Sequence, residues 1–191
     1  MSEINKKIKE MIKEMIKEIQ DRFIVCKKKD TLFQINSNAD DIKNHIEYLT
    51  KKGFITLTQI ACSDWLEDNI FTLNYILTTQ KKDINLMVKV DIPRDDFSFK
   101  TISDIFPQAQ VMERDLHEMY GIKFDGNDTL YDFALEDWED IPPLRREFDT
   151  LKFVNEAYEF KKGRDDNKDV KAETKRRKLE AKKAQEVQDG N

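Results

Sequence analysis

The chain has 191 residues, of which 39% are hydrophobic and 37% charged, and its formal net charge is -5. This length accommodates one domain of ordinary size with extensions, and twelve Phe residues can supply a real core. Five Gly and four Pro leave little room for a loop-rich all-β fold. Cys26 and Cys62 are isolated and no CxxC occurs, which excludes a zinc site or an iron-sulfur cluster built from this chain alone. We expect two free thiols, as in a reducing cytosol.

The distribution of charge and hydropathy disfavours two further function classes, membrane-inserted proteins and nucleic-acid-binding proteins. The N-terminus is too densely charged for a signal peptide, and no apolar run approaches the ~20 residues that cross a bilayer, so we expect membrane association through a partner and no direct insertion. Residues 161–191 carry 11 basic and 7 acidic residues, whereas Glu113–Asp149 carries 4 basic and 12 acidic. The acidic segment argues against nucleic acid and favours a protein-protein interface.

The N-terminal third predicts two helices around a pair of short strands. Residues 2–22 repeat apolar side chains at helical spacing, which indicates a helix packed on a sheet; a basic membrane anchor is the alternative, but Glu residues nearly balance the lysines. Residues 23–26 and 31–35 are expected to be strands, and 40–52 a second helix closed by Gly53. His45, beside the apolar stripe of that helix, is expected to be a boundary residue and not a ligand.

The middle of the chain predicts the rest of a sheet. Residues 54–61 alternate as a strand, with Phe54, Thr56, Thr58 and Ile60 on one face. Residues 71–79 and 84–92 form the clearest hairpin, with its turn at 80–83, and 99–106 is predicted to be a helix-like turn. The layout is α+β, a mostly antiparallel sheet with helices on one face.

Residues 111–149 carry the most distinctive pattern. A short helix ends at Tyr120, and Gly121 suits the left-handed residue that follows a helix. An acidic stretch with single large apolar residues then follows, which is typical of an extended strap lying on another surface. We therefore expect three parts: an α+β domain over 1–124, a strap over 125–160, and a charged, flexible or helical tail over 161–191.

The charged residues of this helix do not predict catalysis. Glu113 and His117, and likewise Arg114 and Glu118, are spaced to form helix ion pairs. Only two His residues exist, no Ser-His-Asp set is indicated, and no nucleotide-binding glycine loop occurs. Arg145 and Arg146 are the binding candidates, because an arginine fork suits carboxylates at an interface; an ordinary solvated charge pair is the alternative.

Two separated blocks resemble the 30-kilodalton subunit family of respiratory complex I and its counterpart in membrane-bound energy-converting [NiFe] hydrogenases. The first block is Glu113-Arg114-Asp115 with Met119-Tyr120-Gly121-Ile122 and Phe124, and the second is Pro143-Leu144-Arg145-Arg146-Glu147-Phe148. The chain departs from the family pattern at three places: Val111 replaces an aromatic residue, Glu118 an Asp, and Asn127-Asp128 the His-Pro pair usual in respiratory members. The last departure favours the hydrogenase branch.

The resemblance implies a non-catalytic scaffold subunit, cytoplasmic and peripheral to the membrane through its partners. It implies no cofactor in this chain, with iron-sulfur clusters and the NiFe centre in partner subunits. The expected partners are the large subunit, of the NiFe or 49-kilodalton type, and the iron-sulfur small subunit. The respiratory complex I subunit is one alternative, and a free-standing small ligand-binding domain is another. The residues expected to bind a partner are Glu113, Arg114, Leu130, Tyr131, Phe133, Trp138, Leu144, Arg145, Arg146 and Phe148.

Overall fold

The computed structural model describes residues 10, 13–14, 16–80, 84–95, 98–135 and 137–157. The chain divides into two compact units, Met1–Asp149 and Thr150–Asn191. Of the second unit only helix α4 (Thr150–Ala157) is described, and the sequence pattern had indicated extended chain there. The expected tail over 161–191 and most of the expected helix over 2–22 lie outside the described residues, although residues 16–20 are helical.

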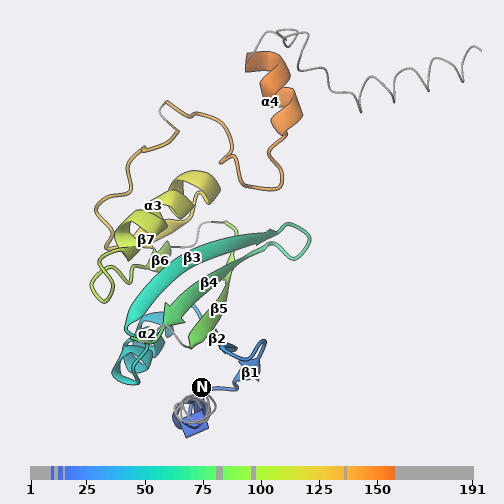
Figure 1. The fold of residues 1–191 in the computed structure, drawn as a ribbon. Helices are drawn as coiled ribbons and strands as arrows, with labels where there is room; N and C mark the ends of the chain where they lie inside the picture. Colours follow the sequence, from blue (N-terminus) through green and yellow to red (C-terminus); the bar gives the residue numbers. More distant parts are fainter. Residues whose placement is uncertain are drawn as a thin grey trace, which may run out of the picture. The chain divides into compact units, whose positions relative to one another are not determined.

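The first unit is built on a five-stranded sheet in the order β1-β2-β5-β4-β3 (Figure 1). The strands are β1 (Cys26–Lys27), β2 (Leu32–Ser37), β3 (Thr56–Trp65), β4 (Ile70–Thr78) and β5 (Asn85–Pro93). Helix α2 (Ile42–Lys51) lies between β2 and β3 in the chain. The β4-β5 hairpin, β2 and α2 confirm the predictions for those segments, whereas the strand predicted over 23–26 overlaps β1 only at Cys26. All pairs in this sheet are antiparallel except β2 and β5, which run parallel.

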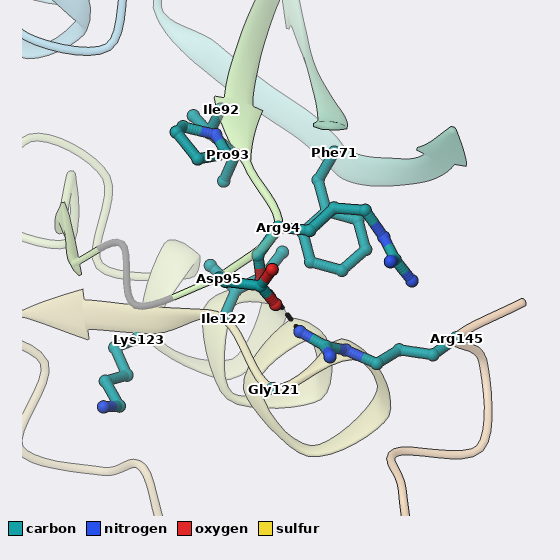
Figure 2. Close-up of a pocket in the computed structure, with 9 residues that line it drawn as sticks. All are labelled: Phe71, Ile92, Pro93, Arg94, Asp95, Gly121, Ile122, Lys123 and Arg145. Carbon is teal, nitrogen blue, oxygen red and sulfur yellow. Dashed lines mark hydrogen bonds between the residues drawn. The ribbon is translucent and has the colours of Figure 1, made fainter. Parts of the chain in front are cut away.

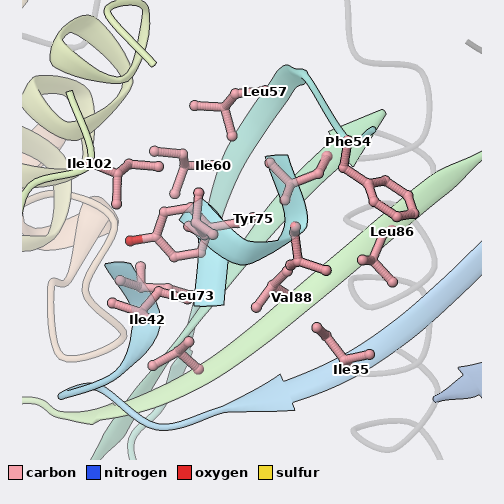
Figure 3. Close-up of a cluster of buried hydrophobic side chains, with 14 of the residues drawn as sticks. Ile35, Ile42, Phe54, Leu57, Ile60, Leu73, Tyr75, Leu86, Val88 and Ile102 are labelled. Carbon is pink, nitrogen blue, oxygen red and sulfur yellow. The ribbon is translucent and has the colours of Figure 1, made fainter. Parts of the chain in front are cut away.

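The sheet has one apolar face and one polar face. Along β4 the side chains of Phe71, Leu73, Tyr75 and Leu77 are all buried, and each stands opposite a buried apolar residue of β5. Side chains of α2 and the loop residue Ile102 complete this core, as Figure 3 shows. On the other face, cross-strand polar pairs replace apolar ones; Thr72, for example, donates to Asp91. The α+β prediction with helices on one face is confirmed.

Strand β3 departs from the predicted alternation. A β-bulge between Leu57 and Gln59 places one additional residue, Thr58, in β3. A bulge reverses the facing of every later residue in the strand. Leu57 and Ile60 are therefore both buried, although they were predicted on opposite faces.

A smaller parallel sheet supports the C-terminal helix of this unit. It contains β6 (Ser98–Lys100) and β7 (Lys123–Asp125), and α3 (Ala109–Tyr120) lies between them in the chain. The helix-like turn predicted over 99–106 is wrong at its start, because Phe99 belongs to β6, where its buried ring stacks with that of Tyr75. Within the described part of the chain, no helix has the length and apolar character needed to cross a bilayer.

Candidate partner interface

Helix α3 ends at Gly121, which lies against the segment that contains Pro142 and Pro143. Gly121 adopts a φ of 76°, and its N-H donates to the carbonyl of His117 at 2.7 Å. A Cβ at this position would lie 3.3 Å from Cγ of Pro142, so both the backbone conformation and the space favour glycine. The predicted helix end is confirmed, and the helix end contacts a residue 21 positions later.

Glu113 is buried inside the unit and cannot contact a partner directly, which corrects the expected role of this residue. Its Oε2 accepts hydrogen bonds from Thr101 at 2.5 Å and Asn127 at 2.9 Å, and its Oε1 accepts from the N-H of Ile102 at 3.0 Å. Burial raises the pKa of Glu113, and these three donors oppose that shift. The carboxylate thus joins α3 to the loop before it and to the turn after β7.

The expected ion pair between Glu113 and His117 is therefore absent. His117 uses Nδ1 to bond the carbonyl oxygen of Ile122 at 2.8 Å. Asn127, one of the departures from the family pattern, is buried; its Oδ1 accepts from the N-H and hydroxyl of Thr129 at 3.0 and 2.6 Å. Asn127 therefore closes a turn and satisfies Glu113 at the same time.

The arginine-containing loop folds back onto the unit. Arg145 donates from Nε to the carbonyl of Tyr120 at 2.8 Å and from Nη2 to the carbonyl of Arg94 at 2.9 Å. Its guanidinium lies 5.3 Å from the ring centre of Phe71. The N-H of Leu144 donates to Met119 at 3.0 Å. Two nitrogens of the Arg145 guanidinium are thus bonded to carbonyls of this chain, and Nη1 lies 3.4 Å from Oε1 of Glu147. Pairing of Arg145 with a partner stays a prediction.

Behind this loop lies a buried ion cluster that the sequence pattern did not reveal. Asp64 receives Nε and Nη2 of Arg94 at 2.8 and 3.1 Å, and the side chains are 3% and 6% exposed. Asp64 also accepts from the N-H of Arg146 at 2.9 Å, while Arg94 contacts Glu147 as well. The partners of Asp64 stand 30 and 82 positions away, and a charge at the end of an alternating strand gives no local signal of them.

A pocket of about 400 Å³ opens beside this cluster (Figure 2). Phe71, Pro93 and Ile122 give it an apolar lining, and Arg145 crosses one side. Lys123 lines it too, and no hydrogen bond or ion pair involves that side chain within the described ranges. Among the described residues, no group of three or more His, Cys, Asp or Glu side chains could hold a metal ion.

The next loop holds two aromatic rings at the surface. Tyr131 and Phe133 are 61% and 64% exposed. Beneath them the guanidinium of Arg114, itself mostly buried, lies 5.0 Å from the ring centre of Tyr131 and 4.2 Å from that of Phe133. Glu118 accepts the N-H groups of Phe133, Ala134 and Leu135 on one oxygen, at 2.9, 2.9 and 2.6 Å.

The electrostatics of Glu118 follow from these bonds. Partial desolvation acts to raise the pKa of Glu118, but the three amide donors and the positive charge of Arg114 outweigh it and lower the pKa below its ordinary value. The predicted ion pair of Arg114 with Glu118 is thus replaced by contacts of both side chains with the same loop. Glu118 binds the loop backbone, and Arg114 binds the loop rings.

The remaining strap residues divide between packed and exposed. Leu130 packs on the core, and the ring of Trp138 is half-buried against Phe148 at 5.5 Å while its Nε1 donates to Ile141. Leu144 and Arg146 are exposed. Exposed apolar residues that the sequence pattern did not single out include Trp65 and Leu66, at the β3-β4 turn. Partner binding by this set stays a prediction.

Comparison with known proteins places this arrangement in a family. Residues 35–154 match the model of the 30-kilodalton subunit of respiratory-chain NADH dehydrogenase. The C subunit of the NADH-quinone oxidoreductase of Rhizobium rhizogenes is 31% identical over 129 residues, which cover 65% of this chain and 64% of that protein. The C/D subunit of the same enzyme from a Psychrobacter species is 34% identical over 85 residues, covering 44% and 14%. The matched region thus spans less than two thirds of these relatives.

A solved structure is similar over more of the chain. A chain from the membrane-bound sulfane sulfur reductase, an archaeal respiratory membrane complex, superposes with a TM-score of 0.73 at 27% identity. The match covers 84% of this chain and 96% of that one. The family match over 35–154 includes both sequence blocks, the one that contains Glu113 and the one whose Arg146 bonds Asp64 of β3.

Proposed function

The chain belongs to the family of the 30-kilodalton subunit of respiratory-chain NADH dehydrogenase, and on that premise we propose that it is a scaffold subunit of a membrane-bound, ion-translocating redox complex. It docks on the large subunit of the complex and performs no chemistry itself. The observation that carries this proposal is the family match over 35–154, which spans most of the sheet, α3 and the arginine-containing loop.

The distribution of polar contacts supports a scaffold more than an enzyme. The buried ion pair of Asp64 with Arg94 joins β3, the residue after β5 and the loop around Arg146. The carboxylate of Glu113 likewise bonds Thr101 and Asn127, which flank α3 in the chain. Both groups are bonded within the chain, so they stiffen a surface without presenting a reactive atom to a substrate.

We place the subunit in an energy-converting [NiFe] hydrogenase type of complex, with respiratory complex I as the alternative. Supporting the first, Asn127-Asp128 stands where respiratory members usually carry His-Pro. The archaeal complex that matches over 84% of the chain is named a sulfane sulfur reductase and favours neither type. Supporting the alternative, the family model and the Rhizobium and Psychrobacter relatives carry NADH dehydrogenase or NADH-quinone oxidoreductase names.

The proposed partners are the large subunit and the iron-sulfur small subunit, with all clusters and the NiFe centre in those chains. The Psychrobacter relative supports direct contact with another subunit of the complex, because its double designation, C/D, joins two subunits in one protein. On this proposal the chain lies on the cytoplasmic side and reaches the membrane only through its partners.

The test is purification of the complex from detergent-solubilised membranes through a tag on this chain. We expect a large subunit and an iron-sulfur subunit in equal amounts, with nickel and iron bound. Hydrogen-dependent reduction of a dye would support the hydrogenase type, whereas NADH-dependent quinone reduction without nickel would support complex I. A tagged chain that elutes alone, as a monomer free of iron-containing partners, would refute the scaffold and favour the free-standing domain.

A further inference from the structure

The loop over residues 131–135 differs from the rest of the strap, because both its backbone and its rings are fixed from below. Three consecutive N-H groups point at one oxygen of Glu118. Such a concave run of amides around an anion fixes the loop conformation. The two rings cannot enter the core of the unit, since the Arg114 guanidinium lies beneath them.

Arg114 is an unusual support for two exposed rings. The side chain is mostly buried, and its Nε has no hydrogen-bond partner among the described residues. A buried cation with an unmet donor is costly to the free chain unless another contact compensates. Cation-π contact with Tyr131 and Phe133 provides part of that compensation, and it orients one face of each ring inward. Both rings keep most of their surface open to solvent.

Apart from Arg114 beneath the rings, the stretch of chain that carries them is acidic. Residues 128–140 contain six Asp or Glu and no Lys or Arg. Asp128, Asp132, Asp137, Glu139 and Asp140 are exposed in the structure. An apolar pair inside an acidic rim is complementary to an apolar hollow inside a basic rim.

We propose that Tyr131 and Phe133 form a preformed anchor that inserts into an apolar hollow rimmed by Lys or Arg on the partner protein, and that Arg114 and Glu118 are positioning residues that fix the anchor before docking. This inference rests on the proposed function, in which the partner is the large subunit. Preorganisation lowers the ordering entropy that association costs. Aromatic residues fixed at the centre of a charged rim are typical of the few that dominate interface energy.

The experiment uses the full chain in its complex. A tagged variant is co-expressed with untagged wild type, and the fraction of variant in the purified complex is measured. Phe133→Ala is expected to lower incorporation by about tenfold or more, and Tyr131→Ala by less. Ile24→Ala, which truncates another highly exposed apolar residue outside the strap, is the matched control and should compete equally with wild type.

The role of Glu118 is tested by a double-variant cycle. Glu118→Ala alone should lower incorporation and should speed hydrogen exchange of the amides of residues 133–135. In the Phe133→Ala background it should have little further effect, because the anchor it positions is gone. Reversing the rim with Asp132→Lys should lower incorporation and weaken its dependence on salt.

Three outcomes would overturn the proposal. If the double variant Tyr131→Ala/Phe133→Ala is incorporated normally, the proposed anchor is refuted, while the proposed function still holds. An equal loss from Glu118→Ala with and without Phe133 would show that Glu118 acts elsewhere. Failure of the tagged wild type to recover any large subunit would refute the proposed function, and the anchor with it.

Discussion

Removing the carboxylate of Asp64 should destabilise the isolated chain strongly. Asp64→Ala leaves the Arg94 guanidinium buried without its two-point partner and also frees the N-H of Arg146. Breaking a buried ion pair by removing one partner costs roughly 3–5 kcal/mol. Glu147 stays in contact with Arg94, so we expect the lower end, about 3 kcal/mol. For a chain of this size that corresponds to a Tm lower by about 6–12 °C.

The assay is urea unfolding of the purified full-length chain followed by circular dichroism, with a thermal melt as the second measurement. Asp68→Ala, which removes an exposed acid from the same hairpin, is the matched control and should change the unfolding free energy by less than about 0.5 kcal/mol. Asp64→Leu with Arg94→Met should be more stable than Asp64→Ala, because no buried charge stays unpaired. A loss below about 1 kcal/mol for Asp64→Ala would show that water solvates the pair, and the reasoning from burial would be wrong.

Three other predictions concern single sites in the same unit. Gly121→Ala should lower the unfolding free energy by about 1–2 kcal/mol, because φ is positive and a Cβ would press on Pro142; an unchanged urea midpoint would contradict this. Tyr75→Phe should leave stability unchanged or raise it slightly, because the buried hydroxyl has no hydrogen-bond partner among the described residues, and a loss above about 1 kcal/mol in the same urea assay would indicate an undetected one. Because the pKa of Glu113 is raised, the folded chain binds the proton of this carboxyl group more tightly than the unfolded chain does. The stability that this proton contributes is complete below the ordinary pKa of 4.5 and is lost as pH rises through the folded pKa. The unfolding free energy of wild type relative to Glu113→Gln, measured in urea from about pH 4 to pH 7, should therefore fall with pH.

Local patterns predicted the parts of the fold that depend on neighbours in the sequence. The β4-β5 hairpin, α2 and the glycine after Tyr120 each follow from side chains within a few positions of one another. The bulge at Thr58 could not be predicted in this way, since either register satisfies the alternation of Leu57 and its neighbours until the core is formed.

Among the residues expected at the interface, local sequence also predicted some outcomes correctly and missed those that depend on distant contacts. Four large apolar residues of the strap have polar neighbours in the sequence that cannot bury them, and Tyr131 and Phe133 are indeed exposed. The same expectation is wrong for Leu130, which packs on the core, and for Trp138, which packs on Phe148. Glu113 and Arg145 were expected at a partner surface, yet their bonds go to this chain's own groups. Apart from the contact of Arg145 with Glu147, their side-chain hydrogen bonds join residues 11 to 51 positions apart, and such distant pairings leave no periodic signal in a single sequence.

The parallel pairing of β2 with β5 has a consequence for synthesis on the ribosome. Leu32 pairs with Asn85, 53 positions later, so β2 leaves the ribosome well before the strand that completes it. At 5–20 residues per second this delay lasts about 3–10 s. During that interval the edge of β2 around Phe33 and Ile35 has no β5 to pair with, and a chaperone can recognise the nascent strand. Protease digestion of chains stalled before and after β5 has emerged should show protection of β2 only in the longer ones.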